Sequence, residues 1–216
     1  MKLWDTSTGQ CLKTFREHRS AVWSIAFSPD GQILASGSLD QTIKLYNVSL
    51  GKTIRILEGH KNWVWSVAFS PNGKLLASTS PDGTLRFWNI NNGECERNLQ
   101  EDAASLQSIV FSSDSQTLAS CSHDYLVKLW NVTTGKCFRA LQGHTSKVWS
   151  VAFSPNDKIL ASSGDDETIR LWDVKTGECL KILKAEKPYE QINIEGVTGL
   201  TEATIATLKV LGASDN

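Results

Sequence analysis

Residues 60–101 read HKNWVWSVAFSPNGKLLASTSPDGTLRFWNINNGECERNLQE, and this stretch decides the fold. Four short apolar runs are separated by Ser-Pro-Asn-Gly, Pro-Asp-Gly and Asn-Asn-Gly, which are sequences typical of tight turns. The stretch therefore predicts four strands in an antiparallel meander. The predicted strands are Val64–Phe69, Leu75–Ser80, Thr84–Ile90 and Glu94–Gln100.

The same pattern returns every 42 residues along the chain, without an insertion or a deletion. Five aromatic residues and five glycines keep this spacing: Trp4, Tyr46, Trp88, Trp130 and Trp172, and Gly9, Gly51, Gly93, Gly135 and Gly177. The inner strands are apolar on both faces, so one unit cannot bury itself, whereas stacked copies can. The sequence therefore predicts an all-β protein with one four-stranded sheet in each repeat.

Two dipeptides recur at fixed places in this repeat. The first is Gly-His, at 59–60 and 143–144, and the second is Trp-Asp, at 4–5 and 172–173. Near matches are Glu-His at 17–18, Tyr-Asn at 46–47 and Trp-Asn at 88–89 and 130–131. Between residue 2 and about residue 184, the chain resembles the WD40-repeat family. The resemblance implies a β-propeller.

Counting the repeats predicts an incomplete propeller with four full four-stranded blades, half a blade and a short C-terminal helical tail. The expected half blade is 1–18, the blades are 19–59, 60–101, 102–143 and 144–184, and the tail is 185–216. A helix is expected near 202–211, because Thr201 can cap its N-terminus. Three interpretations stay open: a fragment of a larger protein, an assembly that closes between chains, and a non-functional gene fragment.

The resemblance also implies a structural hydrogen-bond relay in each blade. A loop histidine binds a turn aspartate and a strand serine, and the serine reaches an indole N–H. The residues at these positions are His18, Ser36, Asp40 and Tyr46; His60, Ser78, Asp82 and Trp88; Ser120, Asp124 and Trp130; and His144, Ser162, Asp166 and Trp172. In the third blade Asp102 replaces the histidine, and Ser113 and Ser115 replace a turn proline and glycine. That blade is expected to be either locally weak or specialised.

In the family, the start of the first strand and the turn before the relay aspartate open onto a narrow face around the propeller axis. The residues expected on this top face are Trp23, Trp63, Trp65, Gln107, His123, Lys147 and Trp149. Aromatic side chains dominate the binding energy of many protein interfaces, which favours a protein-binding face. The alternative is that the indoles merely fill the channel. The chain is therefore interpreted as a non-catalytic protein–protein interaction scaffold.

Other classes of function are less consistent with the sequence. A propeller enzyme or a small-ligand, lectin-like propeller is the alternative, but the Ser-His-Asp sets recur with the repeat and lack a Gly-x-Ser-x-Gly elbow. Net charge is −1, which argues against a nucleic-acid or anionic membrane surface. No cofactor or metal is expected, and the five cysteines show no metal-ligand spacing. Expected instead are a cytoplasmic location, a protein partner and self-association through the open propeller ends.

The tail carries a second resemblance. Pro188-Tyr189 and residues 196–201, which read GVTGLT, resemble the tail that ends bacterial multidomain WD-repeat proteins. Those proteins resemble signalling ATPases with an NB-ARC or NACHT nucleotide-binding domain upstream of the propeller. The resemblance implies the sensing or scaffolding end of a larger bacterial signalling protein. No P-loop lies in this chain, so no ATPase activity is predicted for it.

Overall fold

The computed structural model describes residues 1–100, 105–184, 195, 198, 201–211, 213 and 214 of the 216-residue chain. The chain divides into two compact units, residues 1–182 and 183–216, and each is described by itself. Asp102 and most residues of the tail motif around 188–200 lie outside the described part.

The described residues of the first unit form one two-stranded and four four-stranded antiparallel sheets, in which strands adjacent in sequence are adjacent in space. The two-stranded sheet pairs β1 (Lys2–Trp4) with β2 (Cys11–Thr14). The four-stranded sheets are β3 (Val22–Phe27), β4 (Ile33–Ser38), β5 (Ile43–Asn47) and β6 (Lys52–Leu57); β7 (Ser66–Phe69), β8 (Leu75–Thr79), β9 (Thr84–Asn89) and β10 (Cys95–Gln100); β11 (Leu106–Phe111), β12 (Thr117–Ser122), β13 (Val127–Asn131) and β14 (Cys137–Leu141); and β15 (Val148–Phe153), β16 (Ile159–Gly164), β17 (Thr168–Asp173) and β18 (Cys179–Lys184).

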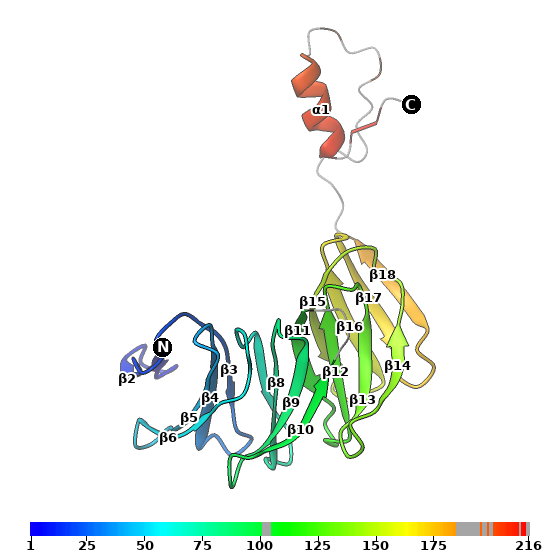
Figure 1. The fold of residues 1–216 in the computed structure, drawn as a ribbon. Coiled ribbons are helices and arrows are strands. Elements are labelled where there is room, and N and C mark those ends of the chain that lie inside the picture. The colour runs from blue at the N-terminus through cyan, green and yellow to red at the C-terminus, as the bar shows by residue number, and fades with distance from the viewer. Residues whose placement is uncertain (101–104, 185–194, 196–197, 199–200, 212, 215–216) are drawn as a thin grey trace. The chain divides into compact units, whose positions relative to one another are not determined.

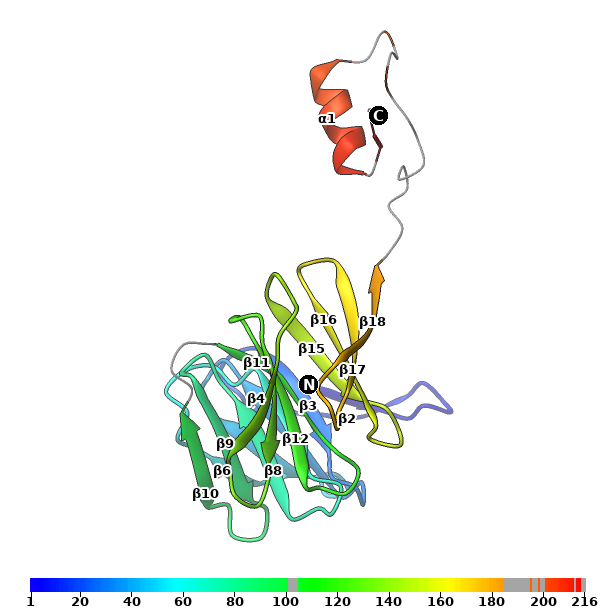
Figure 2. The same ribbon diagram turned by 90° about the vertical axis from the view of Figure 1, so that its right-hand side faces the viewer.

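Figures 1 and 2 show these sheets following one another in chain order, from blue to yellow, without closing into a ring. This is the predicted all-β architecture of an incomplete propeller. All four strands predicted within residues 60–101 are shorter in the structure: β8, β9 and β10 by one residue each, and β7, which begins at Ser66, by two. Trp65 N nevertheless donates to Thr79 O at 3.0 Å, so the backbone pairing continues past the strand end.

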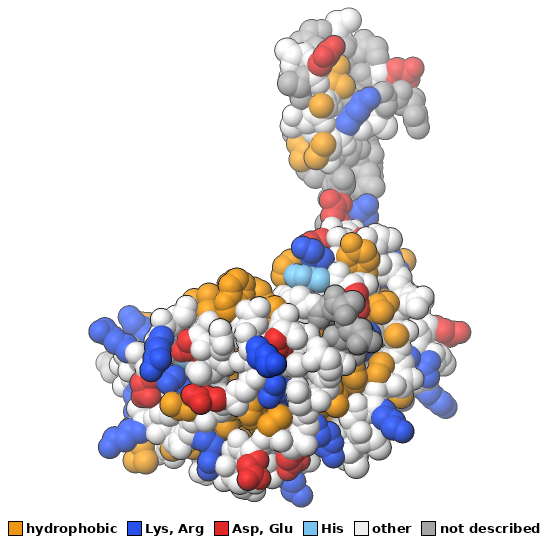
Figure 3. All heavy atoms as spheres, in the orientation of Figure 1, with side chains coloured by type: hydrophobic (Ala, Val, Ile, Leu, Met, Phe, Trp, Pro, Cys, Tyr) orange, Lys and Arg blue, Asp and Glu red, His pale blue; other side chains and the backbone are white. Residues whose placement is uncertain are grey.

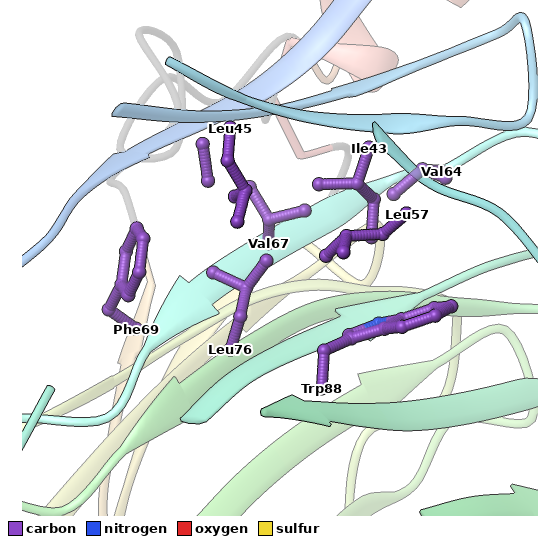
Figure 4. Close-up of a cluster of buried hydrophobic side chains, with 9 residues drawn as sticks. Ile43, Leu45, Leu57, Val64, Val67, Phe69, Leu76 and Trp88 are labelled. Carbon is purple, nitrogen blue, oxygen red and sulfur yellow. The ribbon is translucent and has the colours of Figure 1, made fainter. Parts of the chain in front are cut away.

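The core lies at the joints between successive sheets. At the joint between the sheet of β3 to β6 and the sheet of β7 to β10, Ile43, Leu45 and Leu57 meet Val67 and Leu76, together with the ring of Trp88 (Figure 4). The next two joints bury the same repeat positions. Burying one such side chain stabilises a protein by about 1.5–3 kcal/mol. Each sheet therefore depends on a neighbour for its stability.

The described residues of the second unit form one helix, α1 (Glu202–Val210). Thr201 caps it, since its hydroxyl accepts a hydrogen bond from Thr204 N at 3.1 Å. Among the described residues, no helix is long and apolar enough to cross a membrane.

Candidate functional site

The second full blade shows how the relay residues are arranged. In this blade, His60 precedes β7, Ser78 lies on β8, Asp82 lies in the following turn and Trp88 lies on β9. His60 Nδ1 lies 3.2 Å from Asp82 Oδ2, and His60 Nε2 lies 2.7 Å from Ser78 Oγ. The Trp88 indole donates to the same Ser78 Oγ at 2.8 Å.

The directions of these hydrogen bonds follow from the chemistry of the groups. An ionised carboxylate only accepts, so His60 Nδ1 carries the proton that faces Asp82. Burial lowers the pKa of His60, although the hydrogen bond and charge of Asp82 act to raise it. The ring is therefore neutral at pH 7, and its Nε2 accepts from the Ser78 hydroxyl. The chain of donors thus runs from Trp88 through Ser78 to His60 and on to Asp82.

The other blades repeat this arrangement in part. His144 lies 2.9 Å from Asp166 and 2.7 Å from Ser162, and Trp172 donates to Ser162 at 2.8 Å. In the first full blade, His18 lies 2.8 Å from Asp40 and 2.6 Å from Ser36. Burial raises the pKa of the Tyr46 hydroxyl there, while hydrogen bonds with Ser36 and Thr53 oppose the shift.

In the third blade the described residues bring together a shorter set. Trp130 donates to Ser120 at 2.8 Å, as in the other blades. Asp124 instead accepts from Ser122 and from Leu126 N, and its carboxylate lies 3.6 Å from Lys128 Nζ. The expected contact between Asp102 and Asp124 falls outside the described residues.

Sequence reasoning missed one member of the relay. Thr84 Oγ1 donates to Asp82 Oδ1 at 2.6 Å and lies 3.0 Å from His60 Nδ1. Thr42 and Thr168 make the same hydrogen bond to Asp40 and Asp166, at 2.6 and 2.7 Å. The signal is an Asp-x-Thr pattern at the 42-residue period, and Leu126 breaks it in the blade that also lacks the histidine.

These hydrogen bonds fix loops rather than present reactive groups. The relay aspartates also accept from Arg19 N, Lys61 N and Thr145 N, which ties each loop to the turn of the same blade. Ser78 is fully buried and His60 is 6% exposed. A serine nucleophile has to reach its substrate, so this geometry argues for a structural role. Among the described residues, no group of three or more His, Cys, Asp or Glu side chains is placed to hold a metal ion.

The expected top-face residues form two aromatic groups. The first group joins neighbouring blades: the rings of Trp23 and Trp65 lie 4.6 Å apart, and those of Trp63 and Trp65 lie 5.7 Å apart, both edge to face. Trp23 and Trp63 are 55% and 44% exposed, whereas Trp65 is half-buried between them. The Trp65 indole nitrogen is buried and has no hydrogen-bond partner. Figure 3 shows hydrophobic side chains gathered along the upper edge of the sheets.

The second group joins the third and fourth blades. His123 lies edge to face on Trp149, with 5.1 Å between the ring centroids. The Trp149 indole donates to Asp165 at 2.5 Å, and the side chain is 45% exposed. Burial and the charge of Lys147 lower the pKa of His123, while Asp165 opposes the shift. Lys147 itself is exposed.

Two residues of this face differ from expectation. Gln107 is buried, because its side chain turns back to donate to Ser105 Oγ at 2.9 Å and its carbonyl accepts from Thr79 of the neighbouring blade. It therefore presents no side chain to a partner. His123 is half-buried rather than exposed, because Trp149 packs on its ring and leaves its Nε2 buried without a partner.

Comparison with known proteins identifies the repeat. The family model described as "WD domain, G-beta repeat" matches residues 9–47, 51–89, 93–131 and 135–173, which together cover more than half of the chain.

Similar proteins match over about one repeat each. Eukaryotic translation initiation factor 3 subunit I from Aspergillus niger is 42% identical over 41 residues, which is 19% of this chain and 12% of that protein. A periodic tryptophan protein 2 homolog from Schizosaccharomyces pombe is 43% identical over 42 residues, which is 19% of this chain and 5% of that protein. A Lissencephaly-1 homolog from Caenorhabditis briggsae is 57% identical over 37 residues, or 17% and 10% of the two chains. The matched stretches thus span about an eighth or less of these relatives.

Proposed function

Since the chain belongs to the WD40, G-beta repeat family, whose repeats build scaffolds for protein interaction, we propose that its partner docks on the top face. The residues that would contact the partner are Trp23, Trp63, Trp65, Lys147 and Trp149. The proposal includes no catalytic step.

One observation carries this proposal. Trp23 and Trp63 lie edge to face on either side of Trp65 and keep about half of their surface exposed. Rings that are held by one another lose little conformational entropy on binding, and they offer a large apolar area. The contacts between the rings therefore also reduce the conformational entropy that the indoles would lose when a partner binds.

The polar residues around Trp149 would fix the orientation in which a partner binds this face. Asp165 accepts a hydrogen bond from the indole, and Lys147, whose charge acts on His123, is exposed. With a net charge of −1 for the whole chain, binding should depend only weakly on salt. A partner would thus be anchored by apolar contacts and oriented by a few polar ones.

Substitution of the exposed indoles tests the proposal once a partner has been captured and purified. Trp63→Ala and Trp149→Ala should each weaken binding about tenfold or more, since central aromatic residues contribute about 2 kcal/mol or more to many interfaces. Phe138→Ala is the matched control, because Phe138 is similarly exposed, at 51%, but lies on the outer strand β14. Unchanged affinity for both tryptophan variants, with the fold intact by circular dichroism, would move the site elsewhere.

We also propose a cytoplasmic setting at the sensing or scaffolding end of a larger bacterial signalling protein. The tail resemblance supports the bacterial context, and the odd number of cysteines, five, supports a reducing compartment. Sequencing the genome upstream of the Met1 codon tests the context. An in-frame P-loop domain would support it, and an in-frame stop codon without a start between would overturn it. A fluorescent fusion located outside the cytoplasm would overturn the proposed compartment.

A further inference from the structure

Lys44 occupies a repeat position that carries a positive side chain in every full blade. The residues at this position are Lys44, Arg86, Lys128 and Arg170, each on the third strand of its sheet. Lys44 is only 9% exposed, although a lysine is rarely buried unless its charge is paired. A partner for its ammonium group is therefore expected.

The equivalent side chains of the other blades have such partners. Lys128 Nζ and Arg170 Nε lie 3.6 and 3.9 Å from the relay aspartate of their own blade. The guanidinium of Arg86 lies over the ring of Trp88. The ammonium of Lys44, by contrast, forms neither a hydrogen bond nor an ion pair with the residues that the structure describes. Its charge is therefore buried without a paired charge, which is energetically costly.

The Lys44 side chain lines a cavity of about 110 Å³. A cavity of this size holds several water molecules or one small polar group. Lys44 is the buried residue of the wall, whereas Arg19 and Glu58 are exposed and lie towards the solvent. The lining residues, all from the first full blade, are Arg19, Asp40, Thr42, Lys44, Ile56 and Glu58.

The strand that faces this side of the blade is in place. In the next blade, Trp88 on β9 shares a buried cluster with Leu57 on β6, so the third strand of one sheet faces the outer strand of the sheet before it. Tyr46 on β5 likewise lies against Phe15, which follows β2, with 4.7 Å between the ring centroids. Lys44 points to the same face of β5 as Tyr46, since the two are two residues apart. The cavity therefore remains although the preceding outer strand is present.

The charged groups of the cavity are not all free. The Asp40 carboxylate already accepts from its relay histidine, from Arg19 N, and from the backbone and hydroxyl of Thr42. The side chains of Lys44, Arg19 and Glu58 have no partner among the described residues. Two of these three groups are positive and one is negative, so one positive charge is left uncompensated.

We propose that this cavity binds a carboxylate group, whose oxygens accept from the ammonium of Lys44 and the guanidinium of Arg19. Charge-assisted hydrogen bonds of this kind are among the strongest in proteins. A single negative charge balances the uncompensated positive one, whereas a phosphate dianion would bring a second negative charge next to Glu58. Ile56, which is 47% exposed, offers an apolar wall to a short hydrocarbon stem. The ligand class is therefore a monocarboxylate with a short apolar stem.

Two sources share this chemistry: a free carboxylic acid, and a glutamate side chain of a peptide. Propionate represents the first, and the α-amide of N-acetylglutamic acid represents the second. Tighter binding of the amide derivative than of propionate assigns the site to a peptide side chain. Equal or weaker binding of the amide derivative assigns it to a free acid.

Saturation-transfer NMR on the signals of propionate, with the full chain at constant ionic strength, tests the proposal. Propionate should bind saturably with a dissociation constant in the millimolar range, as is reasonable for a ligand with few atoms. Propionamide has nearly the same shape but no charge, so it should not bind. Each probe can be measured at a low protein concentration, because the ligand signals are detected.

Variants of the protein locate the site. Lys44→Met should weaken propionate binding at least tenfold, because methionine replaces the buried stem but lacks the ammonium. Lys128→Met is the matched control, since this equivalent lysine already faces Asp124 and should not affect binding. Glu58→Gln should tighten binding about twofold to fivefold, because it removes a like charge beside the carboxylate. Circular dichroism checks that each variant folds.

Three results would overturn the proposal. The first is no saturable binding of propionate in the millimolar range, and the second is equal binding of propionamide. The third is an equal loss in Lys44→Met and Lys128→Met, or weaker binding by Glu58→Gln. If Lys44→Met did not fold, the comparison with propionamide and the change at the exposed Glu58 would still decide. None of these results affects the top-face proposal, because Trp63 and Trp149 do not line this cavity.

Discussion

At the scale of the residue, the buried polar side chains of each blade can stay buried only while each of them keeps its hydrogen-bond partners. Ser78 accepts from Trp88 while it lies within hydrogen-bond distance of His60, and the aspartate accepts from a threonine as well as a backbone amide. Removing one member leaves the others buried without a partner, which costs about 1–3 kcal/mol. The relay histidines should therefore behave differently from His123, whose Nε2 has no partner to lose.

His60→Ala and His144→Ala should each lower the free energy of unfolding by about 1–3 kcal/mol, because Asp and Ser lose their shared partner. His123→Ala should cost less than either, since it removes mainly a ring contact with Trp149. Urea denaturation of the three variants and the parent chain measures this. If His123→Ala were the most damaging of the three, the relay would not be the structural element described above.

The same side chains predict how stability depends on pH. Burial holds the pKa of His60 below that of the unfolded chain, so the unfolded state takes up the proton first as the pH falls. Stability should therefore decline below about pH 6.5, the ordinary histidine value. Burial acts to raise the pKa of Asp166, but hydrogen bonds from Thr168, Thr145 N and His144 outweigh it and lower the pKa to about 2. A second loss should follow as the pH falls from about 4 towards 2.

Urea denaturation between pH 8 and pH 2 measures both losses of stability. In His60→Gln the decline between pH 7 and pH 5 should be smaller, because one of the groups responsible is removed. A parent chain that became more stable as the pH fell from 7 to 5 would contradict this prediction.

At the scale of the element, the third sheet differs from its neighbours in two opposing ways. Leu126 replaces the relay threonine, and the described part of its relay is the single hydrogen bond from Trp130 to Ser120. Its turn between the first two strands places Ser115 at φ 61°, a conformation that favours glycine. Ser115 Oγ, however, accepts from Asn72 N at 3.1 Å, and Ser113 N donates to Asp157 at 2.8 Å. These hydrogen bonds tie the turn to the sheets on both sides.

The third sheet should therefore open from its relay end rather than from this turn. Amides of β11 and β12 near His123 should exchange faster than their counterparts in β7 and β8. Hydrogen exchange with mass spectrometry measures this. The double variant Asp102→His and Leu126→Thr, which restores the pattern of the other blades, should raise the protection. Equal protection of both sheets in the parent chain would contradict the prediction.

At the scale of the whole molecule, the repeat makes every sheet depend on a neighbour, and the last sheet has none on its outer face among the described strands. Ile169 is 45% exposed there, whereas its equivalents Ile43, Leu85 and Val127 are completely buried. Contiguous apolar surface of this kind promotes association between molecules.

The chain should consequently self-associate through the outer face of the last sheet. Light scattering and sedimentation should show a mass that increases with protein concentration, and Ile169→Lys should shift the chain towards monomer. Ile54→Lys is the control, because Ile54 is 49% exposed but lies on the outer strand β6. A parent chain that stays monomeric at high concentration would contradict the prediction.

The sequence alone determined the strands, the sheets and the positions of the core. A strict 42-residue period carries this information, because each repeat folds from its own turns and apolar runs, and the same positions are buried at every joint. The relay serines, histidines and aspartates were expected from the resemblance to the WD40-repeat family, whose motif positions they occupy. The threonines that complete the set carry the same period in the sequence, but their contacts with the aspartates were recognised only in the folded chain.

Tertiary structure alone decided how the top face is built. The contact between Trp23 and Trp65 joins residues one full repeat apart, and it depends on how two sheets pack. Gln107 is buried, and its side chain donates to Ser105. His123 is half-buried because Trp149 packs on its ring. No pattern in the neighbouring sequence indicates either contact. The exposure of Ile25 and Phe27 has the same origin, since a side chain of a repeat is buried or open according to the neighbour that covers it.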